Sequence, residues 1–410
     1  MLPIKRTSHC SDVIRVPSGV LAILLLFGIR SNGQTTGDAA GLGDAKRLWE
    51  VTIEEPASAV EYKASAVSPQ DESIWLVIGR RPAGTMSGPQ ALTLHGLDHN
   101  GKTLSDRSLD FLSGETSFLK PGEEFIDLAA TGDGDLALVS TLGQVVTMKA
   151  MSGRVLRRKD VGLGRRFLYV KRALSFSDGG LLLVGFCDSG ATAIRLNKNL
   201  DVVWEKTVDP DQVDTFVDGV VLGDDSFFLA GNVQHGKTAP ISLWVGRFSA
   251  SGELRKSLSI PGQLASVATT SGGGCAVVQG INGPRGQDVW FRNYDRDLRE
   301  LWNVRVGDGI SYNGRPFFVV RVPWIPDEYF IAGVNRPSVL LSRIRAGSGI
   351  VWTRTFQEQS NSMPEAAWNV GLLTTSHSVV IPFTARVMKH QVAEISSNHV
   401  VKVMSVGFGD

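Results

Sequence analysis

The segment TGDGDLALV (131–139) contains the pair of potential metal ligands with the most suggestive spacing, Asp133 and Asp135. Carboxylates at alternate positions around a glycine can begin a calcium-binding loop. Such a loop needs more oxygen ligands and a bidentate glutamate downstream, and the following LALVSTLG supplies none. Since aspartate and glycine also suit a tight turn, we interpret the segment as a hairpin turn and predict no metal site.

Other catalytic patterns are missing from the sequence. The histidines form no HxH or HExxH motif, so a zinc site of the metalloprotease type is not supported. There is no GxSxG elbow, although a catalytic triad is defined by geometry and could come from separate segments. Two glycine-rich segments precede no helix, and we interpret them as loops, GLGRR (162–166) and SGGGCAVV (271–278). We therefore predict no catalytic residue and no cofactor.

Composition and charge limit the partners. The chain has 410 residues with 42 basic and 41 acidic side chains, a formal net charge of +1. Because this balance gives no long-range attraction to polyanions, we expect no nucleic-acid partner. The length suits two average domains or one large all-β domain.

The first residues predict export. Lys5, Arg6 and Arg15 accompany the apolar run VLAILLLFGI (20–29), and SNG (31–33) offers the small residues that a signal peptidase prefers. Ten apolar residues are too few for a membrane-spanning helix. We expect a cleaved signal peptide at 1–33 rather than an uncleaved anchor, a linker at 34–44, and a periplasmic or secreted protein without a membrane span.

Two landmarks repeat seven times along the rest of the chain. Phrases such as SDGGLLLVG end at positions 45 to 61 residues apart: Gly79, Ser140, Gly185, Gly231, Gly280, Gly333 and Pro382. Turns flanked by strand-like runs are centred 46 to 52 residues apart, at Gly101, Gly153, Leu200, Gly252, Leu298, Gly349 and His399. Repetition at this period is typical of β-propellers.

Each repeat unit contains four short runs of strand-forming residues, and no window has a sustained helical period. One four-stranded sheet cannot bury both of its apolar faces, so twisted sheets must pack around an axis. We predict an all-β fold, a seven-bladed β-propeller of four-stranded antiparallel blades, over residues 45–410. Cys187 and Cys275 fall in non-neighbouring units, so we expect two unpaired thiols.

Ring closure has two candidate strands. RLWEVTI (47–53) resembles the fourth strand VVWEKTV (202–208), although no unit precedes it. A strand from the N-terminus could therefore complete the last sheet. The last unit also has its own candidate fourth strand, VVKVMSV (400–406), and the sequence does not decide between the two.

Polar residues are expected along the central channel, which the first strand of each blade lines. Counting back thirteen residues from the first landmark gives Ala66, Asp127, Arg172, Asp218, Val267, Val320 and Asn369, with Arg321 beside Val320. We predict Asp127, Arg172, Asp218, Arg321 and Asn369 as ligand-binding residues of a polar funnel. The alternative is a wet channel whose opposite charges satisfy one another.

Three further features concern tryptophan and arginine. Trp204, Trp302 and Trp352 recur at one repeat position, which indicates packing between blades. Trp324 lies between two prolines in RVPWIPDE, and we predict an exposed loop residue that contacts a partner. A basic cluster is interpreted as a solvated edge, with an anionic partner as the alternative; it contains Arg154, Arg157, Arg158, Lys159, Arg165 and Arg166.

The segment IRAGSGIVWTRTF (344–356) resembles the repeat of quinoprotein-like (PQQ-like) propellers, in which a glycine turn precedes a hydrophobic residue and tryptophan. The phrase SDGGLLLVG is similar to that of exported bacterial propellers. The resemblance covers residues 45 to 408 and implies the propeller fold. The chain lacks the adjacent cysteine pair of the cofactor-binding quinoproteins, so no catalytic residue is carried over.

Two classes of function remain open on this fold. We favour an exported, monomeric, non-catalytic binding or scaffold module that presents loops to a protein, peptide or glycan partner. The alternative is an enzyme, such as a hydrolase, lyase or quinoprotein-like oxidoreductase, with its site at the mouth of the channel.

Overall fold

The computed structural model describes residues 4–7, 45–53, 58–82, 91–109, 123–162, 168–209, 211–234, 239–283, 286–310, 317–335, 338–356, 368–370, 373–374, 378–391 and 394–408. These residues form strands and turns and contain no helix. It follows that this described part has no helix able to cross a bilayer. Of the predicted signal peptide, only residues 4–7 fall within the described residues.

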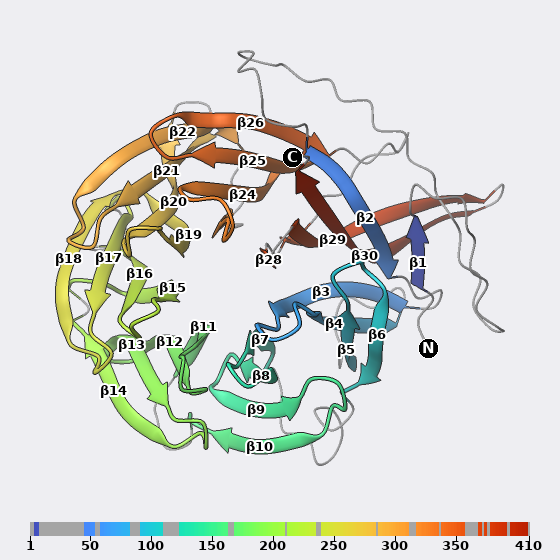
Figure 1. The fold of residues 1–410 in the computed structure, drawn as a ribbon, viewed down its shortest axis with the longest axis horizontal. Coiled ribbons are helices and arrows are strands. Elements are labelled where there is room, and N and C mark those ends of the chain that lie inside the picture. Colours follow the sequence, from blue (N-terminus) through green and yellow to red (C-terminus); the bar gives the residue numbers. More distant parts are fainter. Residues whose placement is uncertain are drawn as a thin grey trace.

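Seven antiparallel sheets surround a central axis (Figure 1), which confirms the predicted seven-bladed β-propeller. Blade 1 contains β3 (Ser58–Val67), β4 (Ile74–Pro82), β5 (Ala91–Leu97) and β6 (Thr103–Ser108). Blade 2 contains β7 (Phe125–Ala130), β8 (Asp135–Ser140), β9 (Gln144–Lys149) and β10 (Val155–Asp160). Blade 3 contains β11 (Tyr169–Ser175), β12 (Leu181–Cys187), β13 (Gly190–Leu196) and β14 (Val202–Val208).

The next three blades repeat this order. Blade 4 contains β15 (Thr215–Val221), β16 (Phe227–Val233), β17 (Ser242–Phe248) and β18 (Leu254–Pro261). Blade 5 contains β19 (Gln263–Thr269), β20 (Cys275–Gly283), β21 (Gly286–Tyr294) and β22 (Glu300–Ile310). Blade 6 contains β23 (Phe318–Arg321), β24 (Glu328–Asn335), β25 (Ser338–Arg345) and β26 (Gly349–Phe356).

Blade 7 is built from both ends of the chain. Its strands are β27 (Trp368–Val370) with β28 (Leu373–Thr374), β29 (Ser378–Gln391), β30 (Glu394–Phe408) and, as the fourth strand, β2 (Ala45–Ile53). β1 (Ile4–Thr7) pairs with the outer edge of β2. The N-terminal strand therefore closes the ring, as one of the two alternatives predicted.

The turn predicted at His399 is wrong, because residues 394–408 form one continuous third strand. The segment 400–406 belongs to this strand and is not the fourth. The physical reason is that the ring closes within this blade. The seventh blade needs no turn between its third and fourth strands, because the fourth strand, β2, comes from the N-terminal part of the chain. The turn landmark therefore recurs six times instead of seven.

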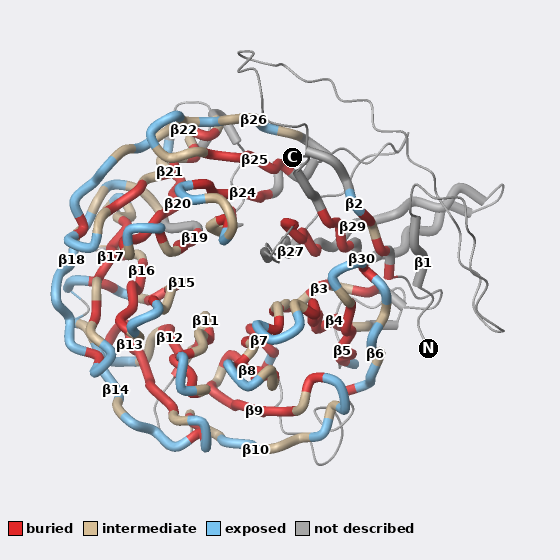
Figure 2. The backbone as a smooth tube through the Cα atoms, in the orientation of Figure 1, coloured by how far each residue is buried: buried red, intermediate tan, exposed pale blue. Residues whose placement is uncertain are grey.

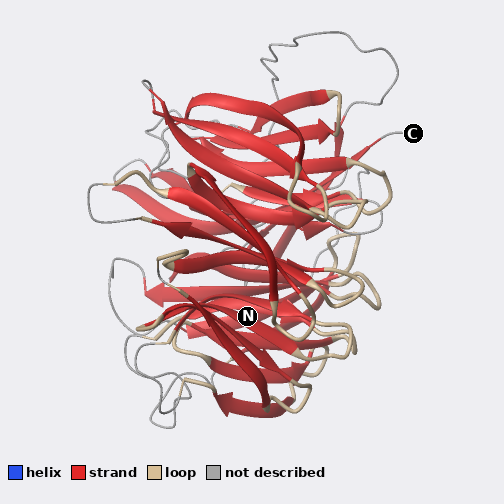
Figure 3. Ribbon diagram, turned by 90° about the vertical axis from the view of Figure 1, so that its left-hand side faces the viewer, coloured by secondary structure: helices blue, strands red, loops and turns tan. Residues whose placement is uncertain are grey.

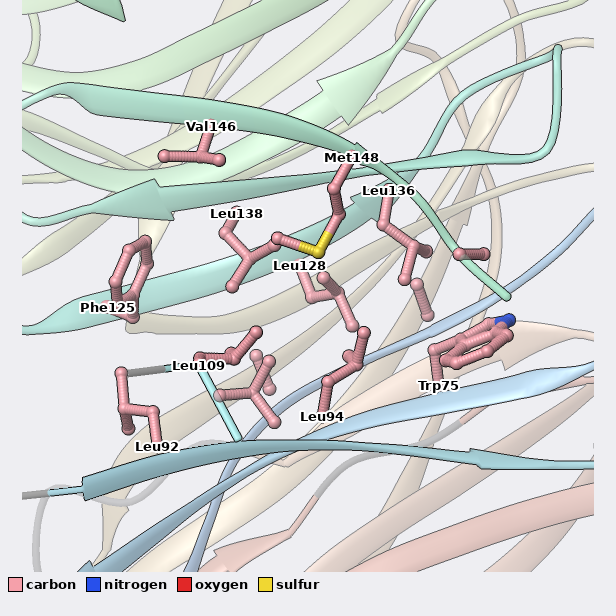
Figure 4. Close-up of a cluster of buried hydrophobic side chains, with 14 residues drawn as sticks. Trp75, Leu92, Leu94, Leu109, Phe125, Leu128, Leu136, Leu138, Val146 and Met148 are labelled. Atoms are coloured by element: carbon pink, nitrogen blue, oxygen red, sulfur yellow. The ribbon is translucent and has the colours of Figure 1, made fainter. Parts of the chain in front are cut away.

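The hydrophobic core lies between neighbouring blades. Figure 4 shows one such cluster, in which Trp75 and Leu94 of blade 1 meet Leu128, Leu138 and Met148 of blade 2. Further clusters join blades 2 with 3, 3 with 4, 4 with 5, 5 with 6, and 7 with 1. In Figure 2 the middle strands are largely buried and the outermost strands largely exposed. Face-to-face packing thus buries the surfaces that one sheet would leave in water.

Candidate functional site

The first strand of each blade is innermost, so its side chains can reach across the axis from several blades (Figure 1). In β7, β11 and β15 the register shifts just before Asp127, Arg172 and Asp218. A bulge of this kind bends a strand and changes the direction of the next side chain. The same register position therefore holds three charged residues in three consecutive blades.

These three side chains form an ion-pair network. Arg172 Nη1 lies 3.1 Å from Asp127 Oδ1, and Arg172 Nε lies 3.4 Å from Asp218 Oδ1. The aspartates are largely buried, with side-chain exposures of 4% for Asp127 and 13% for Asp218, whereas Arg172 is 41% exposed. One guanidinium thus bridges the blades on either side of its own.

Each aspartate also binds the backbone of the next blade. Asp127 Oδ2 accepts a hydrogen bond from the Ala173 amide (2.8 Å). Asp218 Oδ2 accepts one from the Val267 amide (2.9 Å) and another from the Ser266 hydroxyl (2.9 Å). The network therefore joins the inner strands of blades 2, 3, 4 and 5 in sequence.

The ionisation of this cluster favours fixed charge over proton transfer. Asp127 raises the pKa of Arg172 further above its ordinary value, so the guanidinium stays charged. Burial raises the pKa of Asp127, opposed by Arg172 and by two backbone amides. Burial also raises the pKa of nearby Tyr62 to about 12, and the Tyr62 hydroxyl hydrogen-bonds to Ser65 (2.8 Å). The arrangement supplies attraction between blades.

The other two predicted funnel residues do not join this network. Arg321 pairs with Tyr329 at the hairpin end of β23, and Asn369 occupies a bulge in β27. The count from the landmark fails in blade 6 because its hairpin is longer, and in blade 7 because the bulge at Asn369 shifts the register. The residues at the register level of Arg172 are Ala64, Asp127, Asp218, Ser266, Phe318 and Val370. The residues that meet are thus Asp127, Arg172 and Asp218, with Ser266 added.

Blade 6 contains a buried ion pair that the sequence reasoning missed. Glu328 is fully buried, and its two carboxylate oxygens bind Arg343 (Nε to Oε2, 2.6 Å) and Arg345 (Nε to Oε1, 2.8 Å). Blade 3 has a related pair, in which Arg195 Nη2 lies 2.6 Å from Asp178 Oδ1. A sequence signal exists in two blades, where Arg195 precedes Trp204 and Arg343 precedes Trp352 by nine residues.

Blade 1 contains a buried histidine that the sequence did not distinguish. His95 in β5 has no exposed surface, and neither ring nitrogen has a hydrogen-bond partner among the described residues. Its Nδ1 lies 3.6 Å from Asp106 Oδ1, which is too long for a strong hydrogen bond. Burial lowers the pKa of His95, Asp106 partly opposes this effect, and Arg80 adds to it, so that the pKa is about 4.

The predicted turn at Asp133 and Asp135 lies between the first and second strands of blade 2. Asp133 and Asp135 belong to a hairpin turn in which the Gly134 amide binds the Thr131 carbonyl (2.9 Å), and Lys149 pairs with Asp135 (2.8 Å). In the described part of the chain, no three His, Cys, Asp or Glu residues gather as metal ligands. The turn interpretation of this segment is thus confirmed.

The structure also places Trp204 and Trp324, for which the sequence predicted different roles. Trp204 of blade 3 stacks on Phe227 of blade 4 with ring centroids 6.0 Å apart, so this repeat tryptophan packs between blades as predicted. Trp324 lies in the hairpin between β23 and β24 and is half-buried. Its predicted contact with a partner stays a prediction.

The structure also places the two cysteines and part of the basic cluster. Cys187 and Cys275 are both free thiols, as predicted, and Cys275 is buried. Arg157, Arg158 and Lys159 lie exposed on β10, the outer edge of blade 2. Residues 165 and 166 of this cluster are outside the described residues. An outer strand rich in basic side chains resists pairing with other edges, which suits the interpretation as a solvated edge.

Comparisons with known proteins support the fold. No protein-family model matches the chain, and no curated protein matches it in sequence. The C-terminal WD40 domain of Sif2 is 11% identical with a TM-score of 0.50, and the match covers 90% of this chain and 100% of that domain. A Bacteroides caccae protein of unknown function is 13% identical with a TM-score of 0.41, covering 75% of this chain and 97% of the other. The chain is thus similar to known propellers in its fold, a seven-bladed ring of the WD40-like kind.

Proposed function

We infer a binding function from the contrast between the two faces of the ring, one of which is uniform. The hairpins that join first to second strands and third to fourth strands are short, and Figure 3 shows the described loops gathered on this side. Neighbouring hairpins are also linked: Asp225 accepts hydrogen bonds from the Ser177 amide (3.1 Å) and hydroxyl (2.8 Å), and the Ser271 hydroxyl binds Asp327. We name this side the hairpin face. It has the regularity of a structural surface.

The opposite side, which we name the loop face, receives connections of very different length. These join second to third strands, or one blade to the next. They range from the single residue Gly262 between β18 and β19 to the sixteen residues 109–124 between β6 and β7. Connections that vary in length on a rigid scaffold are where binding residues usually lie.

We propose that the protein is an exported, monomeric, non-catalytic binding or scaffold module whose loop face contacts a protein, peptide or glycan. The observation that carries the proposal is the contrast in loop length between the two faces. The channel is consistent with it, since Arg172 and the two aspartates form ion pairs with one another. Export rests on the basic and apolar N-terminal pattern, and kinship with PQQ-like propellers rests on the resemblance of 344–356.

A capture experiment with matched variants tests this proposal. Immobilised protein is exposed to the exported fraction of the native cells and to a glycan array. In one variant a short Gly-Ser linker replaces 110–122, and in the other Trp324 on the hairpin face becomes alanine. Loss of a specific partner in the linker variant, with unchanged thermal unfolding, supports the loop face. Loss only in Trp324→Ala assigns the contact to the hairpin face instead.

The enzymatic alternative has its own readout. Purified protein is assayed for metals by elemental analysis, for a quinone by absorbance, and for turnover on a panel of hydrolase, lyase and dehydrogenase substrates. Turnover that disappears on substitution of channel residues would overturn the proposal of a non-catalytic module.

A further inference from the structure

The second and third strands of blade 7 are longer than their counterparts. β29 has 14 residues and β30 has 15, whereas second and third strands in the other blades have 6 to 9. The two strands pair without interruption from Ser378 and Gly407 to Gln391 and Glu394. The extra length lies at the end where β29 turns into β30, which is the loop face.

This extra length forms a two-stranded arm. On one side β2 ends its pairing at Ile53 with Val401, and on the other β27 begins its pairing at Trp368 with Thr384. Residues 385–391 and 394–400, which we name the blade 7 arm, therefore pair only with each other among the strands that the structure describes. In Figure 1 the arm extends outward from the ring beyond β2.

The arm has properties of an acceptor for a further strand. An isolated two-stranded hairpin is marginally stable in water, and a third strand stabilises it. Each outer edge presents a row of backbone N–H and C=O groups without a strand partner in the described chain, which is the template for strand addition. A strand that adds there would gain backbone hydrogen bonds and order the arm at the same time.

The sequence of the arm selects the kind of strand. The segment 385–391 contains Arg386, Lys389 and His390, whereas 394–400 contains His399 and the single acidic residue Glu394. Pairing with a second copy would place two basic segments side by side, and the antiparallel register that sets Arg386 opposite Lys389 brings like charges together, which is destabilising in a strand pair. An acidic strand would place opposite charges there.

We propose that the blade 7 arm binds an extended acidic peptide segment of a partner protein, which adds as a third strand along residues 385–391. This inference rests on the proposed function and specifies one element of the loop face and the chemistry of its partner. Affinity comes from backbone hydrogen bonds, and selectivity comes from the charges of Arg386 and Lys389.

The test uses the full-length protein and defined peptides. A fluorescent peptide of Glu-Glu-Val repeats, which has glutamates on both faces of the strand, is titrated by anisotropy, beside a Lys-Lys-Val peptide and a Glu-Glu-Val peptide N-methylated at alternate residues. The acidic peptide should bind at least about tenfold more tightly than either control, since one loses the charge and the other the hydrogen bonds. Equal binding of the N-methylated peptide would overturn strand addition.

Two variants separate the arm from the rest of the loop face. In one, Asn-Gly replaces 386–399, joining Ala385 to Val400, which are already paired; it should fold and lose the acidic peptide. In the other, Arg386→Glu with Lys389→Glu should reverse the preference toward the lysine peptide. Unchanged binding in both variants would refute the inference. It would also be refuted if the protein sediments as a dimer and the variant with the trimmed arm does not.

The proposed function can survive that failure. If the trimmed-arm protein still captures its partner from the exported fraction, the arm is not the contact, while the linker variant of 110–122 continues to test the loop face.

Discussion

Protonation of His95 should destabilise the protein as the pH falls, and the structure gives the size of the effect. The side chain is fully buried in β5, and burial lowers its pKa to about 4 from an ordinary 6.5. Between these two pH values the unfolded chain binds a proton on His95 that the folded chain excludes. The free energy of unfolding therefore falls with pH over this window, and the stabilisation is complete only above about pH 6.5.

The magnitude follows from the gap between the two pKa values. Each pH unit of such a gap corresponds to about 1.4 kcal/mol, so the free energy of unfolding falls by about 3 kcal/mol once the pH lies below both pKa values. By about pH 5 the loss should reach about 2 kcal/mol. Because other groups of the protein also titrate over this pH range, the effect of His95 must be measured as a difference between variants.

Urea unfolding at about pH 8 and about pH 5 measures that difference. The stability of wild type minus that of His95→Gln should fall by about 2 kcal/mol between the two conditions. The exposed His99, in the turn after β5, supplies the matched control, and His99→Gln should parallel wild type. A difference between wild type and His95→Gln that does not change with pH would refute the reasoning. So would an NMR titration of His95 in the folded protein near its ordinary pKa.

Four further variants test other parts of the structure by urea unfolding. Arg172→Gln with Asp218→Asn should lower stability by about 2 kcal/mol or more because buried aspartate oxygens lose their partner; unchanged stability would favour a ligand-binding channel. Glu328→Gln should cost about 3 kcal/mol or more, since it leaves a buried guanidinium without its counter-charge. Asp178→Asn, whose side chain is 58% exposed, should cost less than about 1 kcal/mol; equal costs would contradict the role of burial. Trp49→Ala should cost about 3 to 5 kcal/mol because this buried residue of β2 anchors the closing strand; a near-wild-type variant would show that closure does not depend on it.

The fold could be predicted because each blade repeats the same physical solution. Gly185 and Gly231 show why the repeated phrase ends in glycine: a Cβ atom there would overlap the carbonyl oxygen of Tyr169 or Thr215 on the bulged first strand. The phrase therefore ends in glycine because the first and second strands approach closely at that position. Its periodicity was sufficient to predict the strands, their order and the number of blades.

The site was predicted only where the hairpins have standard length. Counting from the end of the repeated phrase succeeded for Asp127, Arg172 and Asp218, which stand four residues before the hairpin hydrogen bonds of Thr131, Phe176 and Leu222. A longer hairpin displaced the count in blade 6, a second strand that reaches its landmark one residue later displaced it in blade 5, and both differences displaced it in blade 1. A count of four residues back from the start of the hairpin gives the correct residue in all three blades.

Other contacts were beyond the sequence for a different reason. The bond between Ser266 and Asp218 joins residues of two blades, and the burial of His95 depends on neighbours from β4 and β6. Such contacts depend on the twist and spacing of sheets, which the repeat pattern does not specify. Likewise, the seventh turn at His399 had the right composition, and only the topology of the closed ring excluded it.

Closure of blade 7 by β2 has a consequence for biosynthesis. This strand precedes the other strands of the seven blades in the sequence, whereas its partner β30 follows them, so β2 is synthesised long before β30. Until β30 is made, the edge of β2 that pairs with it stays unpaired, while the other six sheets can already form. The final joining is a contact between distant parts of the sequence and should be the slow step of maturation. A nascent chain that stalls before its last hairpin would expose that edge, and chaperones or proteases would act on it there.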